Sequence, residues 1–315
     1  MQKLERIEAE LERIAAETGG LVGVSFCHVE SGQRLTLNAG EAFPMASTYK
    51  VAIAARLLKR IDEQRLGLDE MIQITQDDLS PGGGIIKAHF SEPGVALSIH
   101  NLLTVMLTIS DNTASDMLLG LAGGPEQVSE FLQSSGIEGM RVDRSTKILL
   151  TDAFGITDRL PEGKWSYQFL QEHNEAFTER PSVAASETFA MDVRDTSTPE
   201  AMVQLLEAIL HGELLSERSS ALLVDIMRRC ETGESRLRGK LPSATVLAHK
   251  TGTIPRVAIN DVGIVTLPGD QGQVVLSVFV MSRGNGDFIA VHDAERAISN
   301  VARAVYDFAL FARSA

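Results

Sequence analysis

The distribution of strand-like segments is the strongest constraint on what this chain can fold into. Segments rich in alternating or β-branched hydrophobic residues stand near both ends, at residues 21–29, 34–38, 245–250, 259–267 and 273–281. The residues between the two groups have the periodicity of helices. Because strands have to pair with one another, we expect both ends of the chain to meet in one sheet. The sequence therefore predicts an α+β fold, with an antiparallel sheet flanked by helices and built from both termini, and an all-helical lobe inserted between the strands.

The predicted sheet lobe comprises residues 1–46 and 229–315, and the predicted helical lobe comprises residues 47–228. Hydrophobic residues recur at helical spacing in the segments 1–20, 47–64, 98–110, 112–121, 125–133, 199–210, 217–230 and 293–311. The periodicity is weak from 151 to 192, where we expect a long, partly ordered loop with one short helix around 167–172. A cleft between the two lobes is the natural place for a ligand.

The charge and the hydropathy pattern limit the partners of the chain. Its net charge of −13 argues against a nucleic-acid binder, since no basic face is available for phosphates. No segment reaches the roughly 20 apolar residues that a membrane-spanning helix needs. We therefore expect no nucleic-acid or membrane partner. The acidic balance says little about a small-molecule substrate, because the local charge in the cleft decides that. We also expect a monomer. The N-terminus lacks the pattern of a signal peptide, which leaves two locations open: cytoplasmic, or periplasmic or secreted if a leader was removed.

The cysteines and histidines do not indicate a metal or a disulfide framework. Cys27 and Cys230 are the two cysteines; one bridge between them is possible, but two small buried side chains are the favoured interpretation. The seven histidines, including His249 beside a motif described below, show no metal-ligand spacing. The Pro-Gly run at 81–84 lacks the lysine of a phosphate-binding loop and is expected to be a flexible loop near the cleft. We expect no cofactor.

Three short motifs carry the chemistry: Ser47-Thr48-Tyr49-Lys50, Ser110-Asp111-Asn112 and Lys250-Thr251-Gly252. Ser47 opens a predicted helix and Lys50 lies one turn later, so both side chains share a face and we expect them within hydrogen-bond distance. The helix N-terminus favours a developing oxyanion. A partly desolvated lysine near other cations can be neutral at pH 7 and take the proton of the serine. Taken alone, the first motif is also compatible with a helix cap followed by a solvated lysine.

All three motifs in this order are the signature of penicillin-recognising serine enzymes, and the chain resembles class A β-lactamases along nearly its whole length. Residues 108–114, 123–125 and 194–199 are similar to the corresponding stretches of that family. The resemblance implies a β-lactamase-like fold and a serine hydrolase that forms an acyl-enzyme with a β-lactam, an activity associated with antibiotic resistance.

The resemblance also implies a role for each motif residue. Ser47 would be acylated, Lys50 would take its proton, and Ser110 would pass a proton to the leaving nitrogen. Asn112 would bind the side-chain amide of the substrate, although a helix cap is an alternative role for it. Lys250 and Thr251 would hold the substrate carboxylate. The backbone N–H groups of Ser47 and Thr253 would hold the oxyanion. A salt bridge between Arg144 and Asp195 would hold the base of a long loop.

The chain departs from the family in its omega-type loop, expected at about 144–195. The family carries a glutamate two positions after an arginine, and that glutamate activates the water that hydrolyses the acyl-enzyme. Here Thr146 stands two positions after Arg144, and a register that starts from Arg180 places Ser182 there instead. Both registers lose the base. Because general-base assistance contributes roughly 10²–10⁴-fold in rate, we expect acylation to survive and deacylation to be slow.

The loop is also longer than is usual for the family, so that another carboxylate from it could replace the missing base. The candidates are Glu172, Glu175 and Glu187, for which a solvated surface charge is the alternative. Three functions stay open: a β-lactam hydrolase, an esterase or D-amino-acid peptidase on the same scaffold, and an acylatable penicillin-binding or sensor protein.

Overall fold

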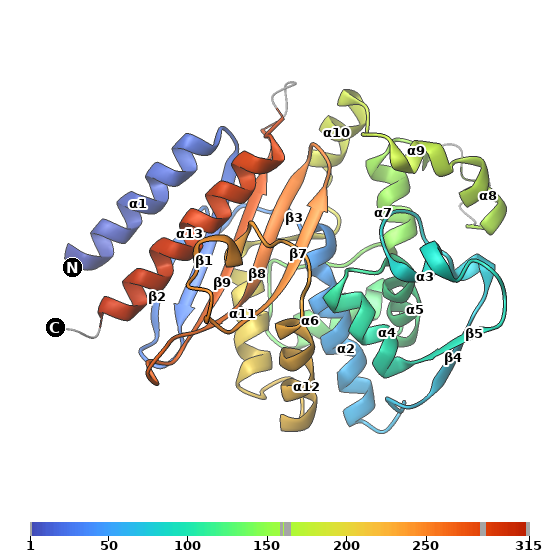
Figure 1. The fold of residues 1–315 in the computed structure, drawn as a ribbon, viewed down its shortest axis with the longest axis horizontal. Helices are drawn as coiled ribbons and strands as arrows, with labels where there is room; N and C mark the ends of the chain where they lie inside the picture. Colours follow the sequence, from blue (N-terminus) through green and yellow to red (C-terminus); the bar gives the residue numbers. More distant parts are fainter. Residues whose placement is uncertain (1, 158–159, 161–164, 284–287, 313–315) are drawn as a thin grey trace.

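The computed structural model describes residues 2–157, 160, 165–283 and 288–312, and it shows a five-stranded sheet beside a group of helices (Figure 1). The strand order is β2-β1-β9-β8-β7, and each neighbouring pair is antiparallel. The N-terminal β1 pairs with the C-terminal β9 along its whole length. One antiparallel sheet built from both termini is therefore confirmed. The strands are β1 Leu21–His28, β2 Gln33–Leu37, β7 Leu247–Ile254, β8 Ala258–Thr266 and β9 Gln273–Met281.

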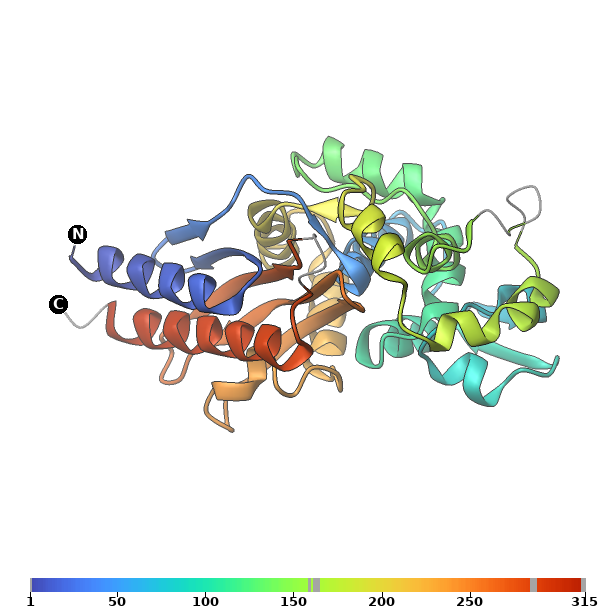
Figure 2. The same ribbon diagram turned by 90° about the horizontal axis from the view of Figure 1, so that it is seen from above.

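Helices cover both faces of this sheet (Figure 2). α1 Gln2–Thr18 and α13 Val291–Ala312 lie side by side on one face, and α11 Pro199–Leu210 packs against the other. The sheet separates two hydrophobic cores, one on each face. Successive side chains of β9 point into different cores, because side chains alternate along a strand. Val278 belongs to the core under α1 and α13, and Phe279 belongs to the core that includes α11.

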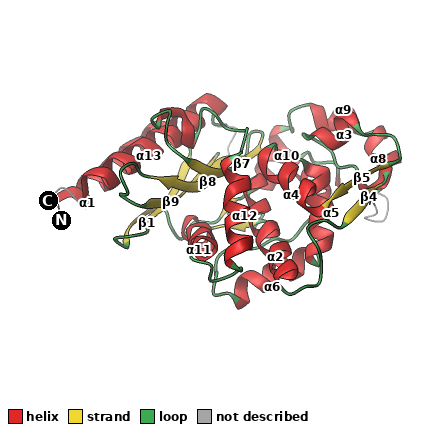
Figure 3. Cartoon of the chain, turned by 60° about the horizontal axis from the view of Figure 1, so that its bottom comes forward, coloured by secondary structure: helices red, strands yellow, loops and turns green. Residues whose placement is uncertain are grey.

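The helical part is organised around α2 Lys50–Asp62, which lies among the other helices (Figure 3). Most of its side chains are buried. This helix contacts α4, α5, α6 and α12. Both α11 and α12 Glu217–Arg228 contact strands as well as helices, so the lobe boundaries given above stay a prediction. The remaining elements of this region are η1 Ala46–Tyr49, η2 Gln76–Asp78, α3 Ile85–His89, α4 Ile99–Thr108, α5 Asn112–Ala122, α6 Pro125–Ser134 and the short strands β3 Phe43–Pro44, β4 Met71–Ile74, β5 Val95–Ser98 and β6 Thr196–Ser197.

The expectation of a mostly irregular segment at 151–192 is wrong. The helix expected around 167–172 is present, but the segment holds further helices, and its elements are α7 Thr146–Ala153, α8 Tyr167–Glu172, α9 Asn174–Thr178 and α10 Val183–Ala190. Serine side chains cap three of these helices, at Ser145, Ser166 and Ser182. Helices this short do not display enough hydrophobic period to be recognised.

Two compositional predictions can be compared with the structure. Both cysteines are free; Cys27 is buried as expected, whereas Cys230 is half-buried. Among the helices in the described ranges, none has the length and apolar character needed to cross a bilayer.

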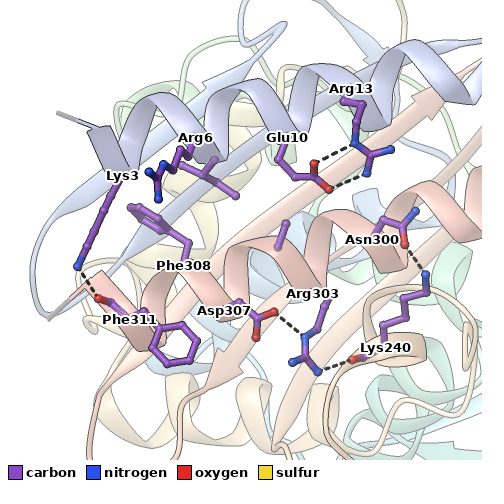
Figure 4. A pocket seen from close by; sticks show the side chains of 12 residues that line it. Lys3, Arg6, Glu10, Arg13, Lys240, Asn300, Arg303, Asp307, Phe308 and Phe311 are labelled. Carbon is purple, nitrogen blue, oxygen red and sulfur yellow. Dashed lines mark hydrogen bonds and ion pairs between the residues drawn. The ribbon is translucent and has the colours of Figure 1, made fainter. Parts of the chain in front are cut away.

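The exposed edges of α1 and α13 carry polar contacts (Figure 4). Nζ of Lys3 donates to the carbonyl oxygen of Phe311 at 2.9 Å, and Nε of Arg303 pairs with Asp307 at 2.8 Å. These side chains border a surface groove of about 590 Å³. Because exposed pairs of this kind contribute little, the two helices are held mainly by their apolar sides.

We expect Leu11→Ala to lower the free energy of unfolding by about 2–5 kcal/mol, because it leaves a cavity in the core under α1 and α13. Leu11 is 1% exposed, whereas Leu4 on the same helix is 37% exposed and provides the matched control. Leu4→Ala should change stability by less than about 0.5 kcal/mol. Urea denaturation measures both changes, and equal losses in the two variants would contradict the packing of α1 described here.

Candidate active site

The candidate nucleophile lies where the edge strand of the sheet meets the start of the central helix. Ser47 is half-buried in the 3₁₀ turn η1, which runs directly into α2. Gly252 of β7 lies so close that a Cβ atom there would stand 2.5 Å from the carbonyl oxygen of Met45 and 3.1 Å from the backbone nitrogen of Ser47. Only glycine fits this approach, which explains the last residue of the third motif. The backbone of β7 therefore lies directly against the backbone of Met45 and Ser47.

Lys50 is fully buried one turn after Ser47. Its Nζ donates to the carbonyl oxygen of Ser110 and to Oδ1 of Asn112, both at 2.8 Å, and it lies 3.2 Å from Oγ of Ser110. Burial, reinforced by the charge of Lys250, holds the pKa of Lys50 well below its ordinary range. The two N–H groups of a neutral amine match the two acceptors at 2.8 Å, and such an amine keeps a lone pair that can take a proton.

The expected hydrogen bond between Ser47 and Lys50 is not formed. Within the described residues, the hydroxyl of Ser47 has no hydrogen-bond partner, whereas Lys50 points its amine at two strong acceptors near the start of α5. These acceptors are distant in sequence, so the spacing of the first motif could not reveal them. Catalytic hydrogen bonds are often long without substrate and tighten when it binds, so the missing bond does not exclude Lys50 as the base.

Ser110 places a hydroxyl between two buried lysines. Its Oγ accepts from Nζ of Lys250 at 3.0 Å and lies 3.2 Å from Nζ of Lys50. The backbone of Ser110 has a φ of +63°, in the left-handed region that non-glycine residues rarely adopt. Burial lowers the pKa of Lys250 to about 8, so this lysine is mostly charged at pH 7. A hydroxyl between two amines whose pKa values differ is well placed to pass a proton.

Asn112 is buried and both ends of its amide are bonded. Oδ1 accepts from Lys50, and Nδ2 donates to the carbonyl oxygen of Pro81 at 2.8 Å. The cap of α5 is Asp111, whose carboxylate accepts a backbone N–H of the first turn at 2.8 Å. A Cβ atom on Gly82 would stand 2.8 Å from Nδ2 of Asn112. The Pro-Gly loop therefore lies directly against Asn112.

The third motif and Thr253, which follows it, place three polar side chains at the edge of the sheet. Lys250 donates to Ser110 and, at 2.9 Å, to the carbonyl oxygen of Thr251. Oγ1 of Thr251 lies 2.6 Å from Oγ1 of Thr232. Thr253 is exposed, and its hydroxyl accepts from Nη2 of Arg236 at 2.7 Å. These groups offer a cation and two hydroxyls to an anionic ligand.

Arg236 is a residue of this site that the sequence interpretation missed. Its Nη1 donates to the carbonyl oxygens of Gly252 at 3.1 Å and Asn260 at 3.0 Å, and its Nε pairs with Glu295 at 3.2 Å. The guanidinium therefore adds a second positive charge beside the third motif. Nothing in the surrounding sequence marks Arg236, because only the tertiary fold brings its loop against β7.

The base of the long loop is tied by a buried ion pair. Nε of Arg144 donates to Asp195 at 2.5 Å, and the two side chains are 4% and 2% exposed. Arg144 also pairs with Asp152 at 2.5 Å and with Asp192 at 2.9 Å. The alternative register, in which Arg180 would pair with Asp195, is therefore wrong.

Thr146 occupies the position two residues after the paired arginine. It is buried, with Oγ1 2.6 Å from the hydroxyl of Tyr49, and its backbone N–H donates to Asp116 at 2.5 Å. Asp116 also accepts from the hydroxyl of Ser80 at 2.7 Å and from the backbone N–H of Lys147 at 3.0 Å. Burial raises the pKa of Asp116. Its carboxyl is thus occupied in holding α7 in place.

The loop carboxylates considered as substitute bases lie on α8, α9 and α10. Glu172 and Glu175 are exposed, and Glu172 accepts from Gln168 at 2.8 Å. In the described part of the chain, neither glutamate hydrogen-bonds to a residue of the three motifs. Glu187 is half-buried and lines a surface hollow with Leu21 and Met281. Over the described residues, no group of three or more His, Cys, Asp or Glu side chains could hold a metal ion.

A serine at the start of a buried helix, together with two buried lysines that share a second hydroxyl, defines a serine acyl-transfer hydrolase. A family model described as the β-lactamase enzyme family matches residues 6–309, and the chain belongs to this family.

Individual relatives show the same relationship over the full chain. Beta-lactamase VEB-1 from Pseudomonas aeruginosa is 29% identical, and the match covers 97% of this chain and 91% of VEB-1. The crystal structure of a β-lactamase from Chitinophaga pinensis is 30% identical with a TM-score of 0.76, covering 96% of this chain and 98% of that one. An ancestral class A β-lactamase is 28% identical with a TM-score of 0.76, covering 96% and 99% of the two chains. The protein is thus a serine hydrolase of β-lactamase type with the class A fold.

We expect Arg144→Ala to lower the free energy of unfolding by about 3–5 kcal/mol, because Asp195 then stays buried without its partner. The double variant Arg144→Ala/Asp195→Ala should lose clearly less than the sum of the two single variants. Arg65, which forms an exposed pair with Glu63, is the control, and Arg65→Ala should cost less than about 1 kcal/mol. Urea denaturation measures these changes; strictly additive losses would show that the two side chains do not act as a pair.

Proposed function

We propose that the protein forms an acyl-enzyme on Ser47 with β-lactams and releases the acyl group slowly. The observation that carries the proposal is the arrangement of two buried lysines around Ser110, one of them, Lys50, a single turn after Ser47 of η1. One amine can take a proton while the other stays positively charged. The relatives described above are named as β-lactamases, which supports a β-lactam as the substrate.

In the acylation step, Oγ of Ser47 attacks the lactam carbonyl while Lys50 takes its proton. The lactam C–N bond breaks, and Ser110 delivers a proton to the leaving nitrogen and is reprotonated by the lysines beside it. The backbone N–H groups of Ser47 and Thr253 stabilise the oxyanion.

Substrate binding uses the side chains around these atoms. Lys250 and Thr251 hold the carboxylate of the substrate, in the field of the Arg236 guanidinium. Asn112 binds the side-chain amide of the substrate and also holds Lys50 in place through its carbonyl oxygen.

Release is proposed to be slow because the carboxylates nearest to the site are engaged in structural bonds. Both oxygens of Asp111 accept backbone N–H groups, at 2.8 and 2.9 Å, and Asp116 holds the start of α7. Thr146, where the family has its glutamate, carries a hydroxyl bonded to Tyr49. A hydroxyl is far too weak a base to activate water at neutral pH.

Incubation with benzylpenicillin or a cephalosporin should give a covalent adduct that intact-mass spectrometry detects on the wild type and not on Ser47→Ala. Lys50→Met should slow adduct formation by roughly 10²–10⁴-fold, because it removes the proton acceptor. Ser134 is exposed on α6, and Ser134→Ala should behave as the wild type. Absence of an adduct with every β-lactam tested would overturn the proposal.

The same experiment follows release after the free β-lactam is removed. The adduct should decay roughly 10²–10⁴-fold more slowly than that of a class A enzyme that has the omega-loop glutamate, and Glu172→Gln and Glu175→Gln should leave the decay unchanged because both side chains are exposed on α8 and α9. Slower decay in either variant would identify that glutamate as a substitute base. Turnover of p-nitrophenyl esters without β-lactam hydrolysis would favour the esterase alternative, and an adduct stable for hours would favour a sensor role.

The efficiency of acylation should fall as the pH rises through about 8, because Lys250 is charged below its lowered pKa and neutral above it. Loss of the charge weakens carboxylate binding, so the concentration of β-lactam needed for half-maximal acylation should increase. Adduct formation measured across the pH range checks this. An acylation efficiency that stays constant from about pH 7 to 9 would show that Lys250 does not hold the carboxylate as a cation.

A further inference from the structure

A row of three side chains leads from the end of α12 to the edge of the sheet. Sγ of Cys230 lies 3.4 Å from Oγ1 of Thr232, which in turn lies 2.6 Å from Oγ1 of Thr251. A Cβ atom on Gly233 would stand 2.4 Å from Cγ2 of Thr251. The backbone after Thr232 is therefore pressed against Thr251, and the contact between the two hydroxyls is held on both sides.

The direction of the hydrogen bond between Thr232 and Thr251 decides whether Thr251 presents a donor or an acceptor to a ligand at the edge of the sheet. A hydroxyl has a single O–H to donate. When Thr232 donates to Thr251, the O–H of Thr251 is free to point at a ligand. When Thr251 donates to Thr232, only lone pairs face the ligand, and lone pairs repel a carboxylate.

The thiol at the inner end of the row can select between these two orders. A protonated Cys230 leaves the O–H of Thr232 available for Thr251, because its own S–H can be donated to the carbonyl oxygen of Thr232 at 3.7 Å. A thiolate is a strong acceptor that takes the O–H of Thr232 instead. Thr251 then donates its own O–H to Thr232, so both hydrogen bonds of the row reverse their direction.

The charged groups that face the thiol are His249 and Lys250 of β7, with Asp261 of β8 behind His249. Nδ1 of His249 lies 2.9 Å from Asp261, and both side chains are buried. Burial opposes the charged form of His249, but the carboxylate of Asp261 outweighs it and raises the pKa of His249 to about 10. Burial also raises the pKa of the Cys230 thiol, but a hydrogen bond from His249 and the charges of His249 and Lys250 outweigh it and lower that pKa to about 7. The pKa of the thiol therefore lies close to neutral pH.

We propose that Thr232 and Cys230 are positioning residues that aim the hydroxyl of Thr251 at the carboxylate of the substrate. This inference rests on the proposed function, in which Thr251 and Lys250 hold that carboxylate. Neither Thr232 nor Cys230 is placed at the reacting atoms, so both act on binding and leave the chemical step unchanged.

Thr232→Val removes the hydroxyl and keeps the shape of the side chain. The benzylpenicillin concentration for half-maximal acylation should rise about tenfold, as expected when a hydrogen bond to a charged group is weakened, while the limiting acylation rate stays within about twofold. The methyl ester of benzylpenicillin, which has no carboxylate, should react equally with both proteins. Thr18→Val removes a buried hydroxyl that bonds Ile14 at the end of α1, and it should behave as the wild type.

Variants of Cys230 test the inner end of the row. Cys230→Ser keeps an O–H group that does not titrate near pH 7, so it should bind benzylpenicillin as the wild type does at about pH 6. From about pH 6 to 8.5, the ratio of wild-type to Cys230→Ser acylation efficiency should fall, because only the wild type forms a thiolate. Both proteins contain Lys250, whose pKa the thiolate raises in the wild type alone. This effect by itself would make the ratio rise with pH, so a falling ratio reports on the row of hydroxyls.

The outcomes separate this inference from the function on which it rests. A wild type that forms no adduct on Ser47 overturns the proposed function. A wild type that forms the adduct, with the same concentration dependence in Thr232→Val, overturns the positioning role alone. An equal loss for benzylpenicillin and its methyl ester overturns it as well, because the defect would then be structural. A pH-independent ratio in the Cys230→Ser comparison overturns the part assigned to the thiol.

Discussion

The approach of β7 to the start of α2 is the contact on which the rest of the site depends. Gly252 leaves no side chain between the strand and the backbone of Met45 and Ser47, so the distance between them is set by van der Waals contact. β7 is the edge strand of the sheet, and an edge strand has backbone groups that are not used for pairing. β7, from the C-terminal part of the chain, and the start of α2, from its N-terminal part, thus lie directly against each other.

The second constraint is the complete burial of the side chains of Lys50 and Lys250. Two ammonium groups that share contact with the hydroxyl of Ser110 cannot both stay charged in a buried place without a large electrostatic cost. Their pKa values are therefore driven apart, with Lys50 well below its ordinary range and Lys250 at about 8. Similar chemical groups acquire different protonation states from their environment alone, which is how one site can both accept a proton and hold an anion.

The sequence predicted long, well-capped elements better than side-chain directions. The helix at 199–210 and the strand at 273–281 were predicted at their observed bounds, because Pro199 at the first helical position and Thr198 as its cap mark the start of α11. The short helices at 174–178 and 183–190 were missed because so few residues show no clear period. The bond expected between Ser47 and Lys50 was wrong because its competitors, Ser110 and Asn112, come from another helix. Arg236 and the pairing of Thr232 with Thr251 could not be predicted for the same reason: they depend on how distant segments pack.

The ion pairs of Arg144 join residues from the two ends of the long loop, since Asp152 lies near its beginning and Asp192 and Asp195 lie at its end. The entropy cost of closing a loop grows only with the logarithm of its length, so a loop clamped in this way tolerates insertions between its anchors. Changes on the exposed faces of α8, α9 and α10 therefore leave the clamp intact, whereas Phe169, Leu170 and Phe177 are buried in the core and fix this stretch to the helical part. New surface groups can arise there, while the buried ion pairs at the foot of the loop stay in place.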